Sequence, residues 1–392
     1  KAFSQSLDEA NWATKVAMAY MAVKPVLSNE EVKAIEEGYL QPAATLLLHR
    51  PAGANWQMWH NSGLAALGIA LENDSIVNVA INKDKYGYHY LIEKHKNNDG
   101  WINEGSPHYH YYPLEALLFT ANAVKCRGIK LFDKDLHDMF VEPVKGTYPD
   151  LSFPAHSDGW YGANLLSQSA LYEVANARYN DPFLKRVLEL TYAQKKRLDS
   201  EALLSNQLIK ASGESLLQQS YSFDTSGFCL LRSDARTVVL KFGGEGIGHG
   251  HPDKLSITIH DGKNELVSDF GTSGYGVPDY LKWYKRTLSH NTVTVDAKDQ
   301  KRSVGKLLKF NPRSDGGYAE AETTTAYPGV RMKRSLDLKG THLQDVYTCT
   351  SDSSHLYEYV ILFNEKPIMD GQPTATTLTG SEVHERIHNT FS

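Results

Sequence analysis

The sequence predicts a helical domain followed by an antiparallel β domain. Two observations support this order. From about residue 8 to 215 the apolar side chains recur every three or four positions, as on one face of a helix. After about residue 220 they alternate with polar side chains in short runs. A block of helices followed by a block of strands is typical of two separate layers, not of an alternating α/β sheet.

The first block contains four clear apolar stripes, separated by long loops rich in Gly, Pro, Asn and aromatic residues. This pattern predicts helical hairpins packed side by side, with their loops gathered at one end. Pro113 is expected to open one of the helices, because proline is favoured in a first turn. The stripes cover residues 63–73, 113–126, 163–179 and 182–196.

The second block contains five strand-like runs punctuated by turns such as "DGK" and "SDGG". We place the junction within residues 212–227, so that the helical domain covers residues 1–215 and the β domain residues 225–392. The runs are residues 237–242, 255–261, 265–270, 291–296 and 356–363.

Composition narrows the class of protein. With 392 residues, 41% hydrophobic and 22% charged, the chain can bury the cores of two or three domains. Its net charge of -5 provides no basic field for nucleic acid or a membrane surface, and no apolar run is long enough to span a membrane. Three widely spaced cysteines argue against a disulfide scaffold. The 22 tyrosines and 6 tryptophans offer flat faces that suit sugar rings, although such residues also line cores.

Two stretches of the helical block carry candidate site residues. In "DGWINEGSPHYHYYPLEALL", Glu104 precedes clustered histidines and tyrosines. This cluster is either an aromatic plug at a helix end or a site in which a phenol acts as acid or base. In "GANWQMWHNSG", amides and tryptophans either begin a helix or bind a carboxylate and a sugar face. Its candidates are Asn55, Trp56, His60 and Asn61.

A third constellation lies at strand borders in the β block. "GIGHGHPDKLSITIH" places His249 and His251 in a glycine-rich loop, and Asp269 and His290 follow in "VSDFG" and "WYKRTLSHNTV". Two imidazoles and a carboxylate, His251, Asp269 and His290, make a plausible zinc set. The alternative is that they are ordinary polar residues hydrogen-bonded at strand ends.

Motifs for phosphate binding, for a serine nucleophile and for glycoside hydrolysis are incomplete or absent. "GGEGIGHG" lacks the Lys-Ser/Thr end of a phosphate loop, and no GxSxG elbow is present for a serine nucleophile. Acidic pairs such as Glu104 with Asp158 or Asp99 keep glycoside hydrolysis open, because no spacing identifies or excludes them.

Together and in this order, the three stretches resemble the heparinase II/III-like polysaccharide lyases. The resemblance covers roughly residues 50 to 300 and is most specific in "EGSPHYHYYPLEAL", "HGHPDKLSI" and "WYKRTLSHNTV". It implies an α/α toroid joined to an antiparallel β-sandwich, with the site in the cleft between them. It also implies a structural Zn²⁺ on His251, Asp269 and His290. No organic cofactor is expected, and the location is expected to be periplasmic or secreted.

The resemblance also implies residue roles. Asn55 would neutralise the substrate carboxylate, although some members carry histidine where this chain has Trp56. Tyr109, ahead of Tyr111, would be the catalytic tyrosine, His249 the active-site histidine and Tyr284 a second tyrosine. The residues expected to bind substrate are Trp56, His60, Asn61, Glu104, Tyr111, His156 and Arg286.

The expected reaction is β-elimination on an acidic polysaccharide that contains uronic acid. The enzyme removes the proton at C5 and expels the C4 oxygen, so it needs a neutralised carboxylate, a base and an acid. We favour a glycosaminoglycan of the heparin or heparan type over alginate. Scattered basic residues would bind the anionic groups of this polymer. The alternative is that these side chains only face water at the protein surface. The alternatives are a glycoside hydrolase on the same toroid and a non-catalytic carbohydrate-binding protein. The basic residues are Lys254, Lys282, Lys285, Arg286 and Arg302.

Overall fold

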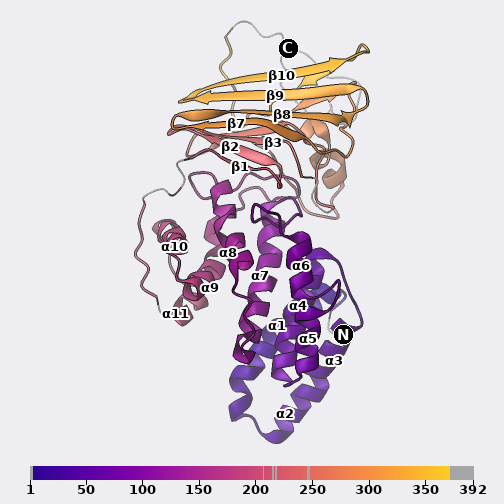
Figure 1. Cartoon of the computed structure of the whole chain (residues 1–392), viewed down its shortest axis with the longest axis vertical. Coiled ribbons are helices and arrows are strands. Elements are labelled where there is room, and N and C mark those ends of the chain that lie inside the picture. The colour runs from indigo at the N-terminus through magenta and orange to yellow at the C-terminus, as the bar shows by residue number, and fades with distance from the viewer. Residues whose placement is uncertain (1–2, 206, 214–215, 217–218, 245–247, 371–392) are drawn as a thin grey trace.

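The computed structural model describes residues 3–205, 207–213, 216, 219–244 and 248–370. Helices fill the first half and antiparallel sheets the second, as predicted, and Figure 1 shows the sheets stacked on one end of the helical layer. Among the described residues, no helix is both long and apolar enough to cross a membrane. The helices are α1 (Ser6–Val23), α2 (Asn29–Ile35), α3 (Gln41–Leu48), α4 (Ala54–Ala70), α5 (Asp74–Asn82), α6 (Tyr88–His95), α7 (Pro107–Val124), α8 (Lys134–Val141), α9 (Ser169–Tyr179), α10 (Pro182–Gln194) and α11 (Ser200–Ser205).

Two helices begin earlier than the apolar stripes indicate. Helix α4 starts at Ala54, so the candidates from Asn55 to Asn61 are helical. Helix α7 starts at Pro107, and the Ser106 hydroxyl caps it by accepting from the Tyr109 N–H. The expectation that Pro113 opens this helix is therefore wrong: it lies inside α7, where it has no N–H to donate to the Tyr109 carbonyl. The earlier start brings Tyr109 into the first turn of a buried helix.

The strands form two main sheets. The first has the order β1-β2-β3-β4-β5, the second β10-β9-β8-β7, and both are antiparallel; β11 and β6 form a short third pair. Residues 306–351, which form the longest strands, were missing from the predicted runs. The strands are β1 (Tyr221–Phe223), β2 (Phe228–Arg232), β3 (Thr237–Lys241), β4 (Ser256–His260), β5 (Glu265–Val267), β6 (Val293–Val295), β7 (Lys306–Arg313), β8 (Gly316–Tyr327), β9 (Val330–Lys339), β10 (His342–Ser351) and β11 (Tyr357–Tyr359).

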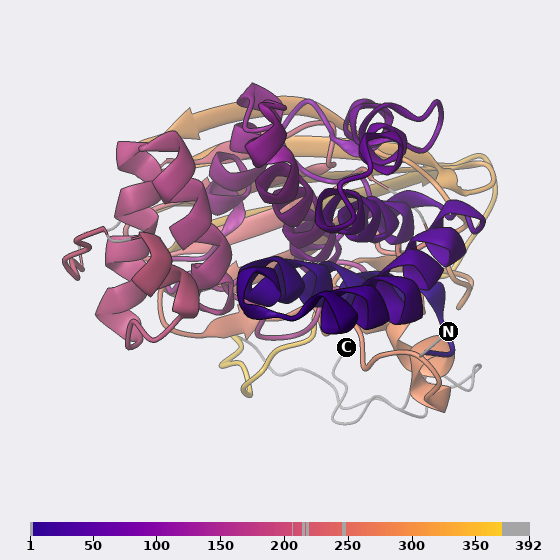
Figure 2. The same cartoon turned by 90° about the horizontal axis from the view of Figure 1, so that it is seen from below.

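The first sheet is buried on both faces. Every residue of β2 and β3 is buried, and the two faces belong to different cores. Phe228, Leu230 and Val239 join the helical core, whereas Leu231 and Leu240 join a core shared with the second sheet. This alternation follows from the two-residue period of a strand. The sheet is thus the middle layer between helices and outer sheet, and Figure 2 shows the helices lying side by side across it.

One buried cation ties the β layers together. Arg334 on β9 is fully buried, and its guanidinium donates to the backbone carbonyls of Leu255 and Asn291 at 2.7 and 2.6 Å. It also donates to Asp345 on β10 at 2.9 Å and to the Tyr359 hydroxyl on β11 at 2.7 Å. Because these partners come from four segments, Arg334 fixes the position of the chain just after His290.

We expect Arg334→Met to lower the free energy of unfolding by about 3 kcal/mol, because it leaves two buried carbonyls unpaired and Asp345 without its cation, with only the Tyr359 hydroxyl as partner. Arg331→Met is the matched control on the same strand. Its partner is Glu322 and its side chain is 59% exposed, so its loss should cost at most about 1 kcal/mol. Urea unfolding of both variants measures the difference. Equal losses would contradict the role given to Arg334.

Candidate active site

A buried carboxylate, Asp158, forms the centre of the candidate site. It accepts hydrogen bonds from His249 Nδ1 and His251 Nε2, each at 2.9 Å. The hydroxyls of Tyr275 and Tyr280 donate to it at 3.0 and 2.9 Å. Burial alone would raise the pKa of Asp158, but its hydrogen bonds from the two imidazoles hold that pKa well below its usual value. The carboxylate therefore stays ionised and orients both histidine rings.

Tyr109 reaches this cluster from the helical domain. Its ring stacks on the His249 ring at a centroid distance of 3.6 Å, and its hydroxyl lies 2.5 Å from the Tyr275 hydroxyl. The Tyr275 hydroxyl in turn lies 2.9 Å from His249 Nδ1. Burial raises the pKa of Tyr109, although the hydrogen bond with Tyr275 opposes this. Tyr109 is therefore a protonated phenol that can donate a proton.

Asn55 and Glu104 lie on the other side of His249. The Asn55 side-chain amide donates to Glu104 Oε2 at 2.6 Å, and its backbone N–H donates to Oε1 at 3.1 Å. His249 Nε2 lies 3.7 Å from Glu104 Oε2. Burial raises the pKa of Glu104. Asp158 is the hydrogen-bond partner of His249 Nδ1, so Nε2 is the nitrogen that faces Glu104. Glu104 thus holds the Asn55 amide on the Nε2 side of His249.

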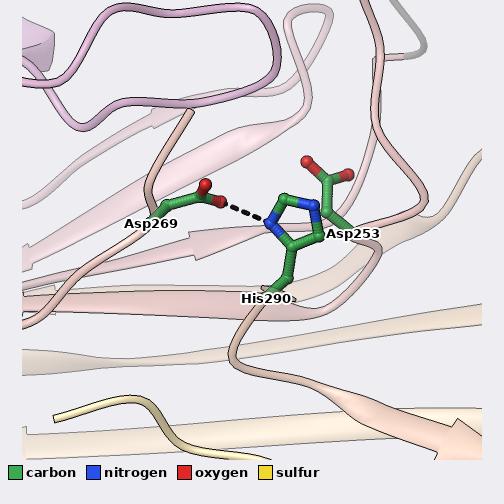
Figure 3. A group of neighbouring side chains, drawn as sticks. All are labelled: Asp253, Asp269 and His290. Atoms are coloured by element: carbon green, nitrogen blue, oxygen red, sulfur yellow. Dashed lines mark hydrogen bonds and ion pairs between the residues drawn. The ribbon is translucent and has the colours of Figure 1, made fainter. Parts of the chain in front are cut away.

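Behind this cluster lies a group that can hold a metal ion. Ligand atoms of Asp253, Asp269 and His290 all lie within 4.8 Å of one another, and His290 Nδ1 is 2.9 Å from Asp269 Oδ2 (Figure 3). His251 lies beside them, its ring centroid 5.3 Å from that of His290. The group thus contains two of the three predicted ligands, Asp269 and His290, together with Asp253, which the sequence analysis did not include; the third, His251, is a neighbour of His290 outside this group.

The donor set fits a divalent ion. His251 Nδ1 and His290 Nε2 are buried without a hydrogen-bond partner in the described part of the chain. Buried polar atoms are rarely left unpaired, and neutral imidazole nitrogens with a carboxylate oxygen are ordinary zinc ligands. Asp253 is already paired with two buried lysines, Lys241 and Lys254. Asp269 is likewise paired with His290 Nδ1, so either carboxylate would exchange a present partner for the ion.

Several predicted site residues lie away from the cluster. His60 is buried at 3.1 Å from the Ser6 hydroxyl, and burial lowers its pKa to about 4. The Asn61 amide donates to the Tyr86 carbonyl at 2.6 Å. The Tyr111 hydroxyl lies 3.0 Å from that of Tyr172, and Arg286 pairs with Asp299 at 2.6 Å. The structure places these four in packing or ion-pair roles, and their part in substrate binding stays a prediction.

The three remaining predicted residues, Trp56, His156 and Tyr284, differ in their exposure and in their neighbours. Trp56 is 38% exposed on α4, next to Asn55. His156 is buried and lines a cavity of about 140 Å³ with Trp101 and Lys241 at the boundary between helices and sheet. Burial lowers the pKa of His156 to about 4, so its ring is neutral. Tyr284 lies in the turn Tyr280–Tyr284, but Tyr280 and Tyr275 are the tyrosines that reach Asp158.

Sequence reasoning missed Asp158 as the centre and Tyr275 as a partner of Tyr109. Both lie in loops that meet through backbone contacts: the Thr272 N–H donates to the Gly159 carbonyl at 3.0 Å. Gly271 has a φ of 58°, and a Cβ there would lie 1.9 Å from the Gly159 oxygen. A glycine that permits such close approach is a usable signal, but the sequence does not say which loop it meets.

Two family models match the chain. The model described as "Alginate lyase" matches residues 7–142, which contain α2 to α8 and all of α1 except Ser6. The model described as "Heparinase II/III-like, C-terminal" matches residues 216–368, which contain all the strands. Both matches agree with the order of helices and sheets in the structure.

Individual proteins agree with the family models. The chain is 27% identical to an alginate lyase of Stenotrophomonas maltophilia, over 95% of this chain and 56% of that protein. It is 28% identical to a heparin-sulfate lyase of Bacteroides stercoris, over 61% of this chain and 35% of that protein. The chain thus spans about half the length, or less, of these relatives.

A solved structure of heparinase III superposes on the chain with a TM-score of 0.74 at 17% identity, covering 95% of this chain and 58% of that one. This likeness supports the fold, an α/α toroid joined to an antiparallel β-sandwich. The chain thus resembles alginate lyases in residues 7–142 and heparinase II/III-like proteins in residues 216–368, and it shares the fold of heparinase III.

Proposed function

We propose that this chain carries the active site of a lyase that cleaves a uronate-containing polysaccharide by β-elimination. The observation that carries the proposal is the contact between Tyr109 of the helical domain and His249 of the sheet domain, bridged by Tyr275. In the proposal the two neighbouring rings act as acid and base, and Asn55, which is bonded to Glu104, binds the substrate carboxylate. Relatives named for alginate and for heparin-sulfate support an acidic polysaccharide as substrate. The proposal includes a periplasmic or secreted location, where such polymers are met.

Each group has one role in the proposed reaction. Asp158 accepts from His249 Nδ1, which leaves Nε2 with a lone pair to take the proton from C5 of the uronate. The Asn55 amide hydrogen-bonds the substrate carboxylate and stabilises the charge that develops on it. The C5–H electrons form the C4–C5 double bond, and the C4–O4 electrons leave with the oxygen. Tyr109 donates its proton to that oxygen.

The heparin or heparan type of glycosaminoglycan remains our preferred substrate class, with alginate as the alternative. Lys285 is the cation beside the catalytic groups: its Nζ lies 3.8 Å from Asp158 Oδ2 and donates to the Gly248 carbonyl at 3.2 Å. A lysine here can attract an anionic sugar unit toward His249 without contacting the reacting carbon.

We further propose a structural Zn²⁺ held by His251, His290 and Asp269, for which Asp269 would exchange its present hydrogen bond with His290 for the ion. Such an ion would supply a fixed positive charge that joins three segments of the sheet domain. The His251 ring donates its other N–H to Asp158 at 2.9 Å, the kind of outer contact that fixes the tautomer of a metal-binding imidazole. β-Elimination itself requires no metal-activated water.

Tyr109→Phe should reduce turnover by about 10²–10⁴-fold, because only the proton-donating hydroxyl is lost. The assay follows the ultraviolet absorbance of the new C4–C5 double bond on a panel of uronate polymers. Tyr39→Phe, an exposed tyrosine on the helical domain, is the control and should keep full activity. Wild type that releases sugars without this absorbance would be a hydrolase, and binding without any product would indicate a binding protein. A loss below tenfold in Tyr109→Phe would transfer the acid role to Tyr275.

Asp158→Asn should lower kcat by about 10–100-fold, the usual effect of losing an orienting partner. It should also lower stability at pH 7 by about 1.5–3 kcal/mol, because Asp158 accepts several hydrogen bonds while charged. The folded protein holds the pKa of Asp158 below its unfolded value of about 3.9. Its contribution is therefore present above pH about 5 and is lost as the pH falls through the folded pKa.

Urea unfolding at pH 7 and pH 3 tests this dependence on pH. The difference in unfolding free energy between wild type and Asp158→Asn should shrink at pH 3. Asp352→Asn, at an exposed position, is the control and should show a small difference at both values. A difference for Asp158→Asn that stays constant with pH would show that its carboxylate is not held ionised by the two imidazoles.

Metal analysis of the purified protein should find about one zinc per chain, and His290→Ala should lose it. Chelation should lower the melting temperature before it lowers turnover, because the ion joins segments of the sheet domain and takes no part in the proton transfers. His355→Ala is the control: this ring pairs with Asp296 at 2.9 Å near the surface, so the variant should retain the metal. Zinc-free wild type would disprove the ion, and immediate loss of turnover in folded protein would disprove its structural role.

A further inference from the structure

The cavity that His156 lines is enclosed by parts of both domains. Its volume is about 140 Å³, which is room for several water molecules or a small ion. The helical domain contributes the loop before α7, and the sheet domain contributes β3 and the turn between β1 and β2. Asn55, Tyr109 and His249 are absent from the described lining of this cavity, so it is separate from the proposed reacting centre.

Two polar side chains in this cavity have no hydrogen-bond partner within the described part of the chain. The Trp101 indole N–H is buried and unpaired. His156 is 6% exposed, and its ring packs edge to face on Phe228 at 5.4 Å without a hydrogen bond to any described residue. Buried polar groups are rarely left unpaired, and a bound water or ion is the usual explanation. The two side chains therefore indicate a guest in the cavity.

Lys241 brings a positive charge to the same cavity. It is the registered partner of Phe228, and Val239, two residues earlier on β3, packs in the helical core. Because side chains alternate along a strand, Lys241 points toward the helices as well. Its ammonium donates to the Ser157 hydroxyl at 2.7 Å and also to Asp253, which uses two of its three hydrogens.

The distribution of charge favours an anion as the guest. Among the described residues that line the cavity there is one lysine and no aspartate or glutamate. Lys241 and Lys254 are both buried and share one carboxylate, Asp253, so one of the two positive charges lacks a counter-charge within this group. The N-terminus of α7, an 18-residue helix, also reaches the cavity through Ser106 and Pro107, and helix N-termini favour negative charge.

We propose that this cavity binds a small tetrahedral oxyanion, sulfate or phosphate, held by Lys241, Trp101 and His156. The donors around the cavity come from three segments, and the oxygens of such an ion accept several hydrogen bonds at once. The ion would join the loop before α7 to β3, and so would tie the two domains together near the helix that carries Tyr109. The site is separate from the proposed reaction, and the inference does not depend on that reaction.

The test titrates the full chain at pH 7 with sodium sulfate and with sodium phosphate, against sodium chloride at equal ionic strength. At least one oxyanion should raise the melting temperature by about 2 °C or more, because an ion that binds only the folded state stabilises it. Calorimetry should give one site with a Kd of about 1 mM or lower, and the two Kd values identify the preferred oxyanion. An equal response to chloride, or no binding of either oxyanion, would overturn the proposal.

Trp101→Phe tests the unpaired indole N–H, because the variant keeps an aromatic ring and loses only the donor. It should weaken oxyanion binding by about tenfold or more, as expected for a lost hydrogen bond to a charged group. Trp59→Phe is the matched control: the Trp59 indole N–H is also buried without a described partner, but Trp59 is not in the described lining of the cavity. It should bind like wild type. Equal binding by the two variants would contradict the assigned site.

A second set of variants locates the ion by a different side chain. His156→Leu should weaken oxyanion binding by about tenfold or more. His60→Leu is its control, because His60 is another buried ring with a pKa of about 4 and is outside the described lining. Lys285→Met, which removes the cation beside Asp158, should also keep wild-type binding. Binding that is lost in Lys285→Met but kept in His156→Leu would place the anion in the candidate active site and overturn the proposal.

Discussion

The candidate site depends on one desolvated carboxylate. Asp158 is fully buried and ionised, which is costly unless hydrogen bonds replace the lost water. Its donors come from two regions of the chain, the histidine loop before β4 and the segment that carries Tyr275 and Tyr280. Because those donors must converge on one carboxylate, the loops of the helical and sheet domains can close in few ways. The position of His249 opposite Tyr109 follows from that closure.

The first sheet, β1 to β5, packs one face on the helices and the other on the second sheet, and this fixes the loops that meet at Asp158. Strands β2 and β3 contribute alternate residues to the helical core and to the core between the sheets, so they cannot slide without exposing one apolar set. Lys241 at the end of β3 and Ser256 at the start of β4 are registered partners. The loop between them carries His249, His251 and Asp253. Rigid strands at both ends therefore hold a loop that is rich in glycine.

The sequence predicted what depends on local pattern. Helical and strand periods gave the order of the domains, and compact motifs led to Tyr109, His249 and the group around His290. Long-range contacts were not accessible: nothing in the sequence places Asp158 between two histidines about 90 residues away or Tyr275 against a hydroxyl in another domain. Within residues 306–351, β7 and β10 have only exposed or half-buried side chains and so lack a strongly apolar face, whereas β8 and β9 do alternate buried with less buried positions, which the sequence analysis missed. His60 and Tyr111 resembled site residues because buried polar groups and catalytic groups share residue types.

The acidic substrate that we propose would approach a site that contains four buried carboxyls, each of which has a partner within the protein. Asp253 is paired with two lysines, Asp269 with His290, and Asp158 with two imidazoles and two phenols. Burial raises the pKa of Glu104, and the Asn55 amide is its partner. The negative charge of these carboxyls is thus compensated within the protein. In the proposed reaction, a uronate would reach the Asn55 side-chain amide by displacing its hydrogen bond to Glu104, without meeting an uncompensated carboxylate.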